Sequence, residues 1–97
     1  MSNQLAIITG SEGEFETRNS GDDIIKEIVE LEGLSPILNP AICFEMLAID
    51  NVTISINGRK PFTLKAGTEL EKSKVLISSV VILTTGAKFS YYVELRP

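Results

Sequence analysis

The sequence contains no histidine and no tryptophan, and it has a single cysteine among its 97 residues. Histidine is the most common general base of enzymes and a very common protein ligand of metal ions. Its absence excludes Ser-His-Asp and Cys-His nucleophile systems within the chain, and it excludes zinc sites built with histidine. The composition therefore argues against most enzymes, and we expect no catalytic residue, no cofactor and no metal site.

The lone cysteine, Cys43, cannot form a disulfide bond within the chain or supply the four thiolates of an all-cysteine zinc site. It stands between Ile42 and Phe44, with no basic residue beside it in the sequence. A reactive thiol needs a nearby positive charge, whereas a free cysteine among apolar residues behaves as a small hydrophobic side chain. We expect Cys43 to be buried and unreactive.

Long hydrophobic runs are also absent. The longest apolar stretch, Val75–Leu83, is interrupted by Ser78 and Ser79 and is much shorter than the roughly 20 residues of a membrane helix. The first residues carry no basic charge, and the apolar run Leu5–Ile8 is too short for a signal peptide. The sequence predicts a soluble protein made in the cytoplasm, without a membrane partner.

The composition is that of a globular protein, with 43% hydrophobic and 23% charged residues, and the length suits one domain over residues 1–97. The charge is uneven: residues 1–50 hold ten acidic and two basic side chains, and residues 51–97 hold three acidic and seven basic ones. Two interpretations remain open. The charges mix over one domain, or two surfaces of opposite sign attract between copies, as in head-to-tail rings and stacks.

Hydrophobic alternation predicts about seven strands. They are expected at Leu5–Thr9, Glu12–Arg18, Ile42–Ile49, Val52–Ile56, Phe62–Leu64, Val75–Thr84 and Ala87–Leu95. Asn57-Gly58 is a strong signal for a type I′ hairpin, and Pro61 marks the returning strand as an edge strand or the site of a bulge. Val75–Thr84 is apolar on both faces, which predicts a central strand covered on both sides, so Val81→Asp is expected to abolish folding.

The segment Asp22–Glu32 has apolar residues at helical spacing and predicts a helix. Ser20 is the expected N-cap, with Asp23 at the third helical position, and Gly33 is the expected stop. Two glutamates near the C-terminal end are unfavourable for the helix dipole, so a pair of strands remains the alternative. The pairs Ser35-Pro36 and Asn39-Pro40 frame the next segment, and residues before proline avoid the helical region, so Ser35–Pro40 is predicted to be an extended connector.

These elements favour one fold class. Short strands with turn signals near every ten residues are typical of β-sandwiches and barrels, and no helices separate the later strands. We expect a mainly β protein: a small antiparallel β-sandwich or jelly-roll-like barrel with one short helix near residues 22–32.

Two acidic groups could in principle bind a cation. Glu12, Glu14 and Glu16 alternate along one side of an extended segment, where they suit either a calcium or acid/base site or a charged edge that prevents aggregation. Asp22–Asp23 and Asp50–Asn51 are explained without a ligand by helix capping and turn formation.

The second half offers a basic strip with Phe62 nearby: Arg59, Lys60, Lys65, Lys72 and Lys74. Basic charge next to exposed aromatic rings is typical of single-strand nucleic-acid sites. Phe62 alternates with Leu64, however, which predicts that it belongs to the core, and the net charge is −4. The sequence therefore argues against a nucleic-acid partner.

The pair Tyr91-Tyr92 places one ring on each face of a strand. The outward ring, assigned to Tyr92, could stack on a sugar, anchor a neighbouring subunit, or be an ordinary surface tyrosine. A segment before the helix, residues 1–19, which contains Phe15, could form an arm that contacts neighbours. The candidate interface residues are Phe15, Tyr92, Arg59 and Lys60.

Four motifs within Asp50–Glu94 carry a resemblance: Val52–Gly58, Phe62–Thr68, Ile77–Ile82 and Gly86–Phe89. Together they resemble the small β-sandwich modules of tailed-phage virions and related contractile particles, found in decoration, neck, collar, fibre-base and tail proteins. The resemblance covers about half the chain. It implies homo-oligomers in rings or symmetric clusters, other virion proteins as partners, a location in the virion, and no catalysis.

Three functions follow as hypotheses. The first is a non-enzymatic structural subunit of a phage or phage-like particle, whose arm before Ser20 contacts its neighbours, for example by adding a strand. The second is a small ligand- or carbohydrate-binding module that uses the exposed tyrosine and the acidic ladder. A cupin-like enzyme is disfavoured, because such folds hold their metal with histidines.

Overall fold

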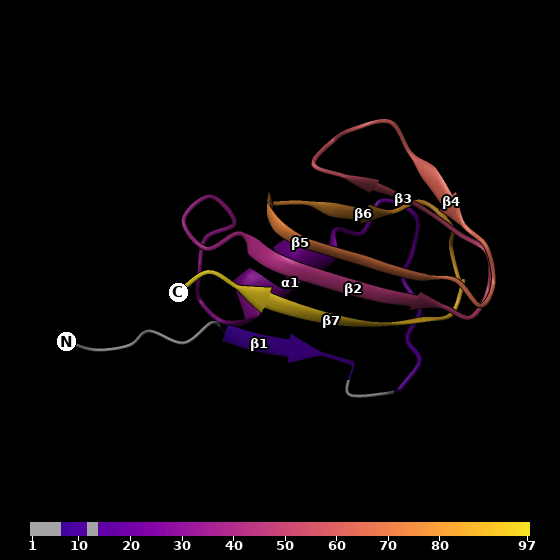
Figure 1. The fold of residues 1–97 in the computed structure, drawn as a ribbon, viewed down its shortest axis with the longest axis horizontal. Helices are drawn as coiled ribbons and strands as arrows, with labels where there is room; N and C mark the ends of the chain where they lie inside the picture. The colour runs from indigo at the N-terminus through magenta and orange to yellow at the C-terminus, as the bar shows by residue number, and fades with distance from the viewer. Residues whose placement is uncertain (1–6, 12–13) are drawn as a thin grey trace.

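Two antiparallel sheets stacked face to face, with one short helix beside them, make up the fold (Figure 1). The computed structural model describes residues 7–11 and 14–97. The expected fold class, a small antiparallel β-sandwich with one short helix, is confirmed.

The four-stranded sheet contains, in spatial order, β1 (Ile7–Gly10), β7 (Phe89–Leu95), β2 (Ala41–Ala48) and β5 (Glu69–Ile77). The three-stranded sheet contains β4 (Phe62–Leu64), β3 (Val52–Ile56) and β6 (Val80–Ile82). The helix α1 (Ile24–Leu31) lies behind the four-stranded sheet in Figure 1. Backbone bonds join the residues before α1 to β6, so the helix continues the second layer next to that strand.

The core lies between the two layers and is entirely apolar in its centre. Alternate residues of the strands point into it, and α1 adds one apolar stripe. The fully buried side chains with the largest volumes are Phe44, Phe89, Ile24, Ile25, Met46, Ile54, Ile77, Ile82, Leu95, Val29, Val52 and Val80.

The helix begins and ends where its capping groups lie. Asp23, not Ser20, is the N-cap: its carboxylate accepts from the backbone N–H groups of Ile25 and Lys26. The predicted cap at Ser20 is wrong, because the helix begins at Ile24, directly after Asp23, and Ser20 lies too far before it. The Ser20 backbone N–H donates to the Thr85 hydroxyl. The predicted stop at Gly33 is confirmed by its φ of 70°, a left-handed conformation that suits glycine.

The connector Ser35–Pro40 was predicted to be extended, and this prediction is wrong. The Asn39 N–H donates to the Ser35 carbonyl at 2.7 Å, and the Asn39 side-chain oxygen accepts from the Ser35 N–H at 3.3 Å. These bonds close a compact turn because serine and asparagine side chains readily bond to nearby backbone. The Asn39 amide also donates to the Arg96 carbonyl, which fixes the turn against the chain beyond β7.

The predicted central strand Val75–Thr84 does not exist. The chain turns at Ser78–Ser79, so β5 and β6 belong to different sheets, and each is an edge strand. The side-chain oxygen of Asn57 accepts from the N–H groups of both serines, and the Ser79 hydroxyl donates to Asp23. Partners from distant parts of the sequence therefore stabilise this corner.

The hairpin between β3 and β4 is confirmed. Asn57 and Gly58 have φ values of 53° and 70°, and the Arg59 N–H donates to the Ile56 carbonyl at 3.0 Å, as a type I′ turn requires. Pro61 comes directly before β4, which is an edge strand as predicted.

The predicted arm is only partly described, since Glu12 and Gly13 lie outside the described residues. Residues 14–18 form no regular strand, but Glu16 exchanges two backbone hydrogen bonds with Phe89, at 2.7 and 3.0 Å. This part therefore follows β7 of its own chain, and contact with a neighbouring subunit stays a prediction.

Candidate functional site

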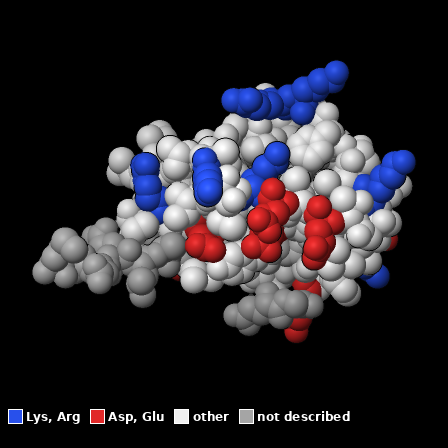
Figure 2. All heavy atoms as spheres, viewed as in Figure 1, with Lys and Arg blue, Asp and Glu red and all other residues white. Residues whose placement is uncertain are grey.

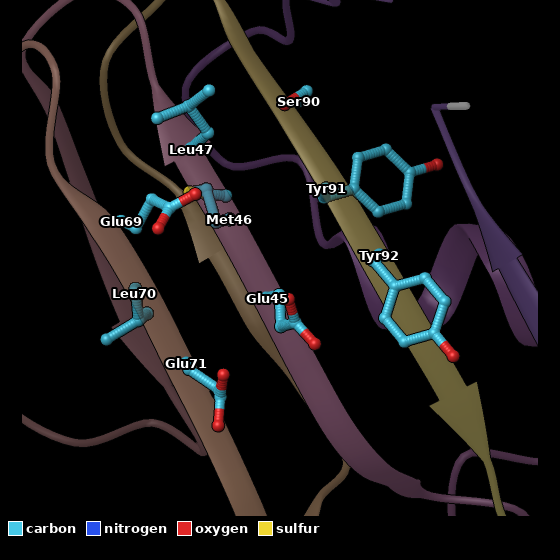
Figure 3. A pocket seen from close by; sticks show the side chains of 9 residues that line it. All are labelled: Glu45, Met46, Leu47, Glu69, Leu70, Glu71, Ser90, Tyr91 and Tyr92. Carbon is cyan, nitrogen blue, oxygen red and sulfur yellow. The ribbon is translucent and has the colours of Figure 1, made fainter. Parts of the chain in front are cut away.

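The outer side of the four-stranded sheet carries one of two charged surfaces, which we call the acidic face: Glu45, Glu69, Glu71, Glu94 and Tyr92. Glu45 on β2 lies directly opposite Glu71 on β5 and opposite Tyr92 on β7, so the three side chains form one row across the sheet (Figure 3). Figure 2 shows the acidic side chains gathered on this side of the molecule. Like charges opposite one another destabilise a sheet, so the folded chain tolerates a cost here.

Tyr92 points outward as predicted, and its hydroxyl donates to the Glu94 carboxylate at 2.8 Å. This hydrogen bond is the main reason why the pKa of the Tyr92 phenol is raised above its ordinary value. Tyr91 points the other way and packs against the core, with its ring centroid 6.1 Å from that of Phe89.

The acidic face holds a shallow hollow of about 240 Å³ beside these tyrosines (Figure 3). Ligand sites usually measure roughly 300–1,000 Å³. The Tyr92 hydroxyl is already bonded to Glu94, and the carboxylate of Glu45 lies opposite Tyr92 in the sheet. The hollow therefore offers little to the carbohydrate-binding hypothesis.

Cys43 also lies on the acidic face, half-exposed, so the prediction that it is a buried residue is wrong. Phe44 points into the core, and alternation along β2 turns Cys43 outward, where it faces Glu94 in the sheet. Its sulfur lies 3.9 Å from the carboxylate of Glu45. Desolvation first, and then the negative charges of Glu94, Glu45 and Glu71, raise the pKa of the Cys43 thiol.

The raised pKa predicts slow alkylation of Cys43 in the folded protein. Near pH 9.0, the ordinary thiol value, iodoacetamide should react more slowly with the native chain than with the urea-unfolded chain, because less thiolate is present. The shift stabilises the native state fully below the ordinary thiol pKa, and this contribution is lost as the pH rises through the raised value.

Glu45→Gln separates charge from access in the same assay. The variant removes one negative charge beside the sulfur and keeps the size of the side chain, so native Cys43 should react faster than in the wild type. An unchanged native rate in this variant would show that limited access alone protects the thiol.

The glutamates of the predicted acidic ladder do not form a cation site among the described residues. Glu12 lies outside the described residues, Glu14 is exposed, and Glu16 pairs with Arg18 at 2.7 Å. Among residues 7–11 and 14–97, no three acidic or cysteine side chains are placed to hold a metal ion.

The two aspartate pairs also serve the backbone. Asp22 accepts from the Asn19 N–H, Asp50 accepts from the Lys88 N–H, and Asn51 accepts from the Ala66 N–H, at distances of 2.8–2.9 Å. The expected helix cap within Asp22–Asp23 is confirmed at Asp23. Asp50 and Asn51 bind backbone groups that are distant in the sequence, so their expected explanation by turn formation alone is not what the structure shows.

The second charged surface, which we call the basic groove, lies between β5 and the β3–β4 hairpin and has a volume of about 540 Å³. Its lining combines three cations with apolar side chains and contains no acidic residue: Ile56, Asn57, Arg59, Lys60, Phe62, Lys72, Val75, Leu76 and Ile77. Phe62 is 38% exposed, so its predicted place in the core is wrong. The ring belongs to the inner side of β4 but lies at the open edge of the sandwich.

A bulge in β5 shapes one wall of the basic groove. Ala41 pairs with Ile77 and Cys43 pairs with Ser73, so three residues of β5 lie opposite Ile42 alone. Lys74 takes a φ of 60° within this bulge, an uncommon conformation for a long side chain. The bulge leaves Val75 and Leu76 at 46% and 54% exposure.

The predicted interface residues do not form one site. Arg59 and Lys60 lie together at the basic groove, Tyr92 lies on the acidic face, and Phe15 is exposed on the segment before α1. The acidic face draws on both halves of the sequence, so the halves do not correspond to two surfaces.

Sequence reasoning missed Val75 and Leu76, although the adjacent Lys-Ser-Lys run and the two serines marked the end of a buried strand.

The acidic face and the basic groove are the two candidate binding surfaces that the described residues form. Within residues 7–11 and 14–97, no helix has the length and hydrophobicity that a membrane crossing requires. Comparison of the chain with models of protein families, with curated proteins and with solved structures found no match.

Proposed function

We propose that this protein is a non-enzymatic structural subunit that assembles with copies of itself in a phage or phage-like particle. The observation that carries the proposal is the basic groove, where Phe62, Val75 and Leu76 are exposed together. Exposed apolar groups rimmed by polar ones are typical of protein–protein interfaces. The resemblance of Asp50–Glu94 to virion modules supports the proposal that this particle is a phage or a phage-like one.

The edge strand next to the groove supports the same conclusion. β5 has nine residues and, among the described strands, pairs with β2 alone, so one side of its backbone is available for pairing. Natural proteins protect such edges with charges and bulges, and β5 has both at Lys72 and Lys74. The charges and the bulge thus disfavour non-specific pairing of other strands with β5. Val75 and Leu76 remain exposed and can contact a specific partner.

Other virion proteins are the further partners in this proposal, reached through the segment before Ser20 with its exposed Phe15. The virion is the proposed location. Nucleic acid is disfavoured because the net charge is −4 and the acidic face would repel phosphates.

Light scattering coupled to size-exclusion chromatography tests the assembly. We expect a mass that is a multiple of 10.6 kDa, with rings or symmetric clusters in negative-stain electron micrographs. A clean monomer at high protein concentration would contradict the proposal.

A further inference from the structure

Exposed apolar side chains gather in a second place, which we call the α1 end: residues Glu30–Leu38. It contains the two most exposed large apolar side chains among the described residues, Leu31 at 85% and Ile37 at 81%, and Leu38 is also exposed. None of the three is needed by the core of the same chain. Together with the basic groove, the α1 end accounts for most of the exposed large apolar residues.

The α1 end is acidic as well as apolar. Glu30 and Glu32 lie at the C-terminal end of the helix, where the helix dipole is negative, and no basic residue occupies the last turn. Neither glutamate takes part in an ion pair within residues 7–11 and 14–97. Two charges that weaken the helix are thus uncompensated within the described part of the subunit.

The basic groove has the complementary character. Arg59, Lys60 and Lys72 surround it, none of them in an ion pair with another described residue, and Phe62, Val75 and Leu76 supply its apolar floor and wall. An apolar and acidic segment is the occupant that would neutralise these cations and cover these side chains.

Within one subunit the two surfaces do not cover each other. Neither Glu30 nor Glu32 is in an ion pair with a cation of the basic groove, and Leu31 and Ile37 remain 85% and 81% exposed. The turn after α1 lies near the C terminus, where Arg96 bonds to the Leu38 carbonyl, and the β3–β4 hairpin lies at the top of the view (Figure 1). A contact between them therefore joins two copies. Because the two surfaces differ, the contact is head-to-tail and either closes into a ring or extends as a filament.

We propose that the α1 end of one copy docks into the basic groove of the next copy. The inference rests on the proposed function and names the surfaces that join its subunits. Leu31 and Ile37 pack against Phe62, Val75 and Leu76, and Glu30 and Glu32 lie near the three cations of the groove.

Charge reversal on each surface tests this contact. Glu30→Lys with Glu32→Lys, and separately Arg59→Glu with Lys60→Glu, should each weaken association by about tenfold or more, since each places like charges across the contact. A chain that carries all four substitutions restores opposite charges and should associate again. Association is measured by sedimentation velocity, and circular dichroism checks that each variant is folded.

Two further variants control the result. Leu31→Ser changes no charge and alters a side chain that is 85% exposed, so it should fold normally and still weaken association. Glu69→Lys with Glu71→Lys makes the same change of charge on the acidic face and should leave association unchanged. Loss of association in this variant alone would overturn the proposed contact in favour of the acidic face.

The outcomes separate this inference from the proposed function. If the wild type is an oligomer and both reversed variants remain fully associated, the docking contact is wrong while the structural role stands. If the wild type itself is a monomer at high concentration, both fail.

Discussion

Val80→Asp is expected to abolish the folded state, whereas Val81→Asp, one residue further along β6, should leave the protein folded. Val80 is completely buried on the inner side of the three-stranded sheet, beside Ile56 in the pairing register. A carboxylate introduced there would lie among apolar side chains without a partner. Such an unpaired buried charge costs about 3–5 kcal/mol, a large share of the roughly 5–15 kcal/mol by which a domain is stable.

The control position lies on the opposite side of the same strand. Val81 pairs with Ser55 and is only half-buried, so a carboxylate there reaches water and should cost about 1 kcal/mol. This corrects the expectation from the sequence alone, which placed the critical position at Val81. Urea unfolding followed by circular dichroism checks both variants. Cooperative unfolding of Val80→Asp near the wild-type midpoint would show that the inner and outer sides of β6 are exchanged.

Asp23→Ala should give the second large loss, about 2–4 kcal/mol, because one carboxylate serves two elements. Its Oδ1 atom accepts from the Ile25 and Lys26 N–H groups at the start of α1 and from the Val80 N–H at the start of β6. Its Oδ2 atom accepts from the Ser79 hydroxyl at 2.9 Å. Alanine removes the helix cap and leaves the partly buried backbone group of β6 without its acceptor.

Neighbouring and conservative substitutions give the matched controls. Asp22→Ala removes one hydrogen bond, from the Asn19 N–H, and should cost less than about 1 kcal/mol. Asp23→Asn keeps a side-chain oxygen that can cap the helix, so its loss should be intermediate. The free energy of unfolding of the three variants is compared from their urea midpoints. Equal losses of stability in Asp22→Ala and Asp23→Ala would show that Asp23 does not join α1 to β6.

Local signals predicted the elements whose structure depends on adjacent residues. Asn57-Gly58 determines its turn through the φ values that the two residues accept, and the apolar stripe of α1 predicted a helix over nearly the correct range. The N-cap was misplaced by three residues because both Ser20 and Asp23 are good caps. The choice between them depends on Ser79 and Val80, which bind Asp23 from far along the sequence.

Predictions failed where distant residues decide the outcome. The two serines interrupt the apolar run after Val75, but no adjacent residue indicates that its two parts belong to different sheets, since the distant Asn57 and Asp23 stabilise the corner between them. Phe62 follows the alternation of a core residue, but it is 38% exposed because it lines the groove between the hairpin and β5. The basic groove could therefore be predicted as a set of cations, but not as a concave surface.

The position of β7 has a consequence for synthesis of the protein. β7 follows the other described strands in the sequence, yet it lies between β1 and β2 in the four-stranded sheet, with Ile7 paired to Leu95. While the ribosome has not yet made β7, β1 has no neighbour among the described strands and one edge of β2 has no backbone partner. The four-stranded sheet can therefore form only after β7 is made, and the apolar segments of the nascent chain are open to chaperones and to aggregation during that interval.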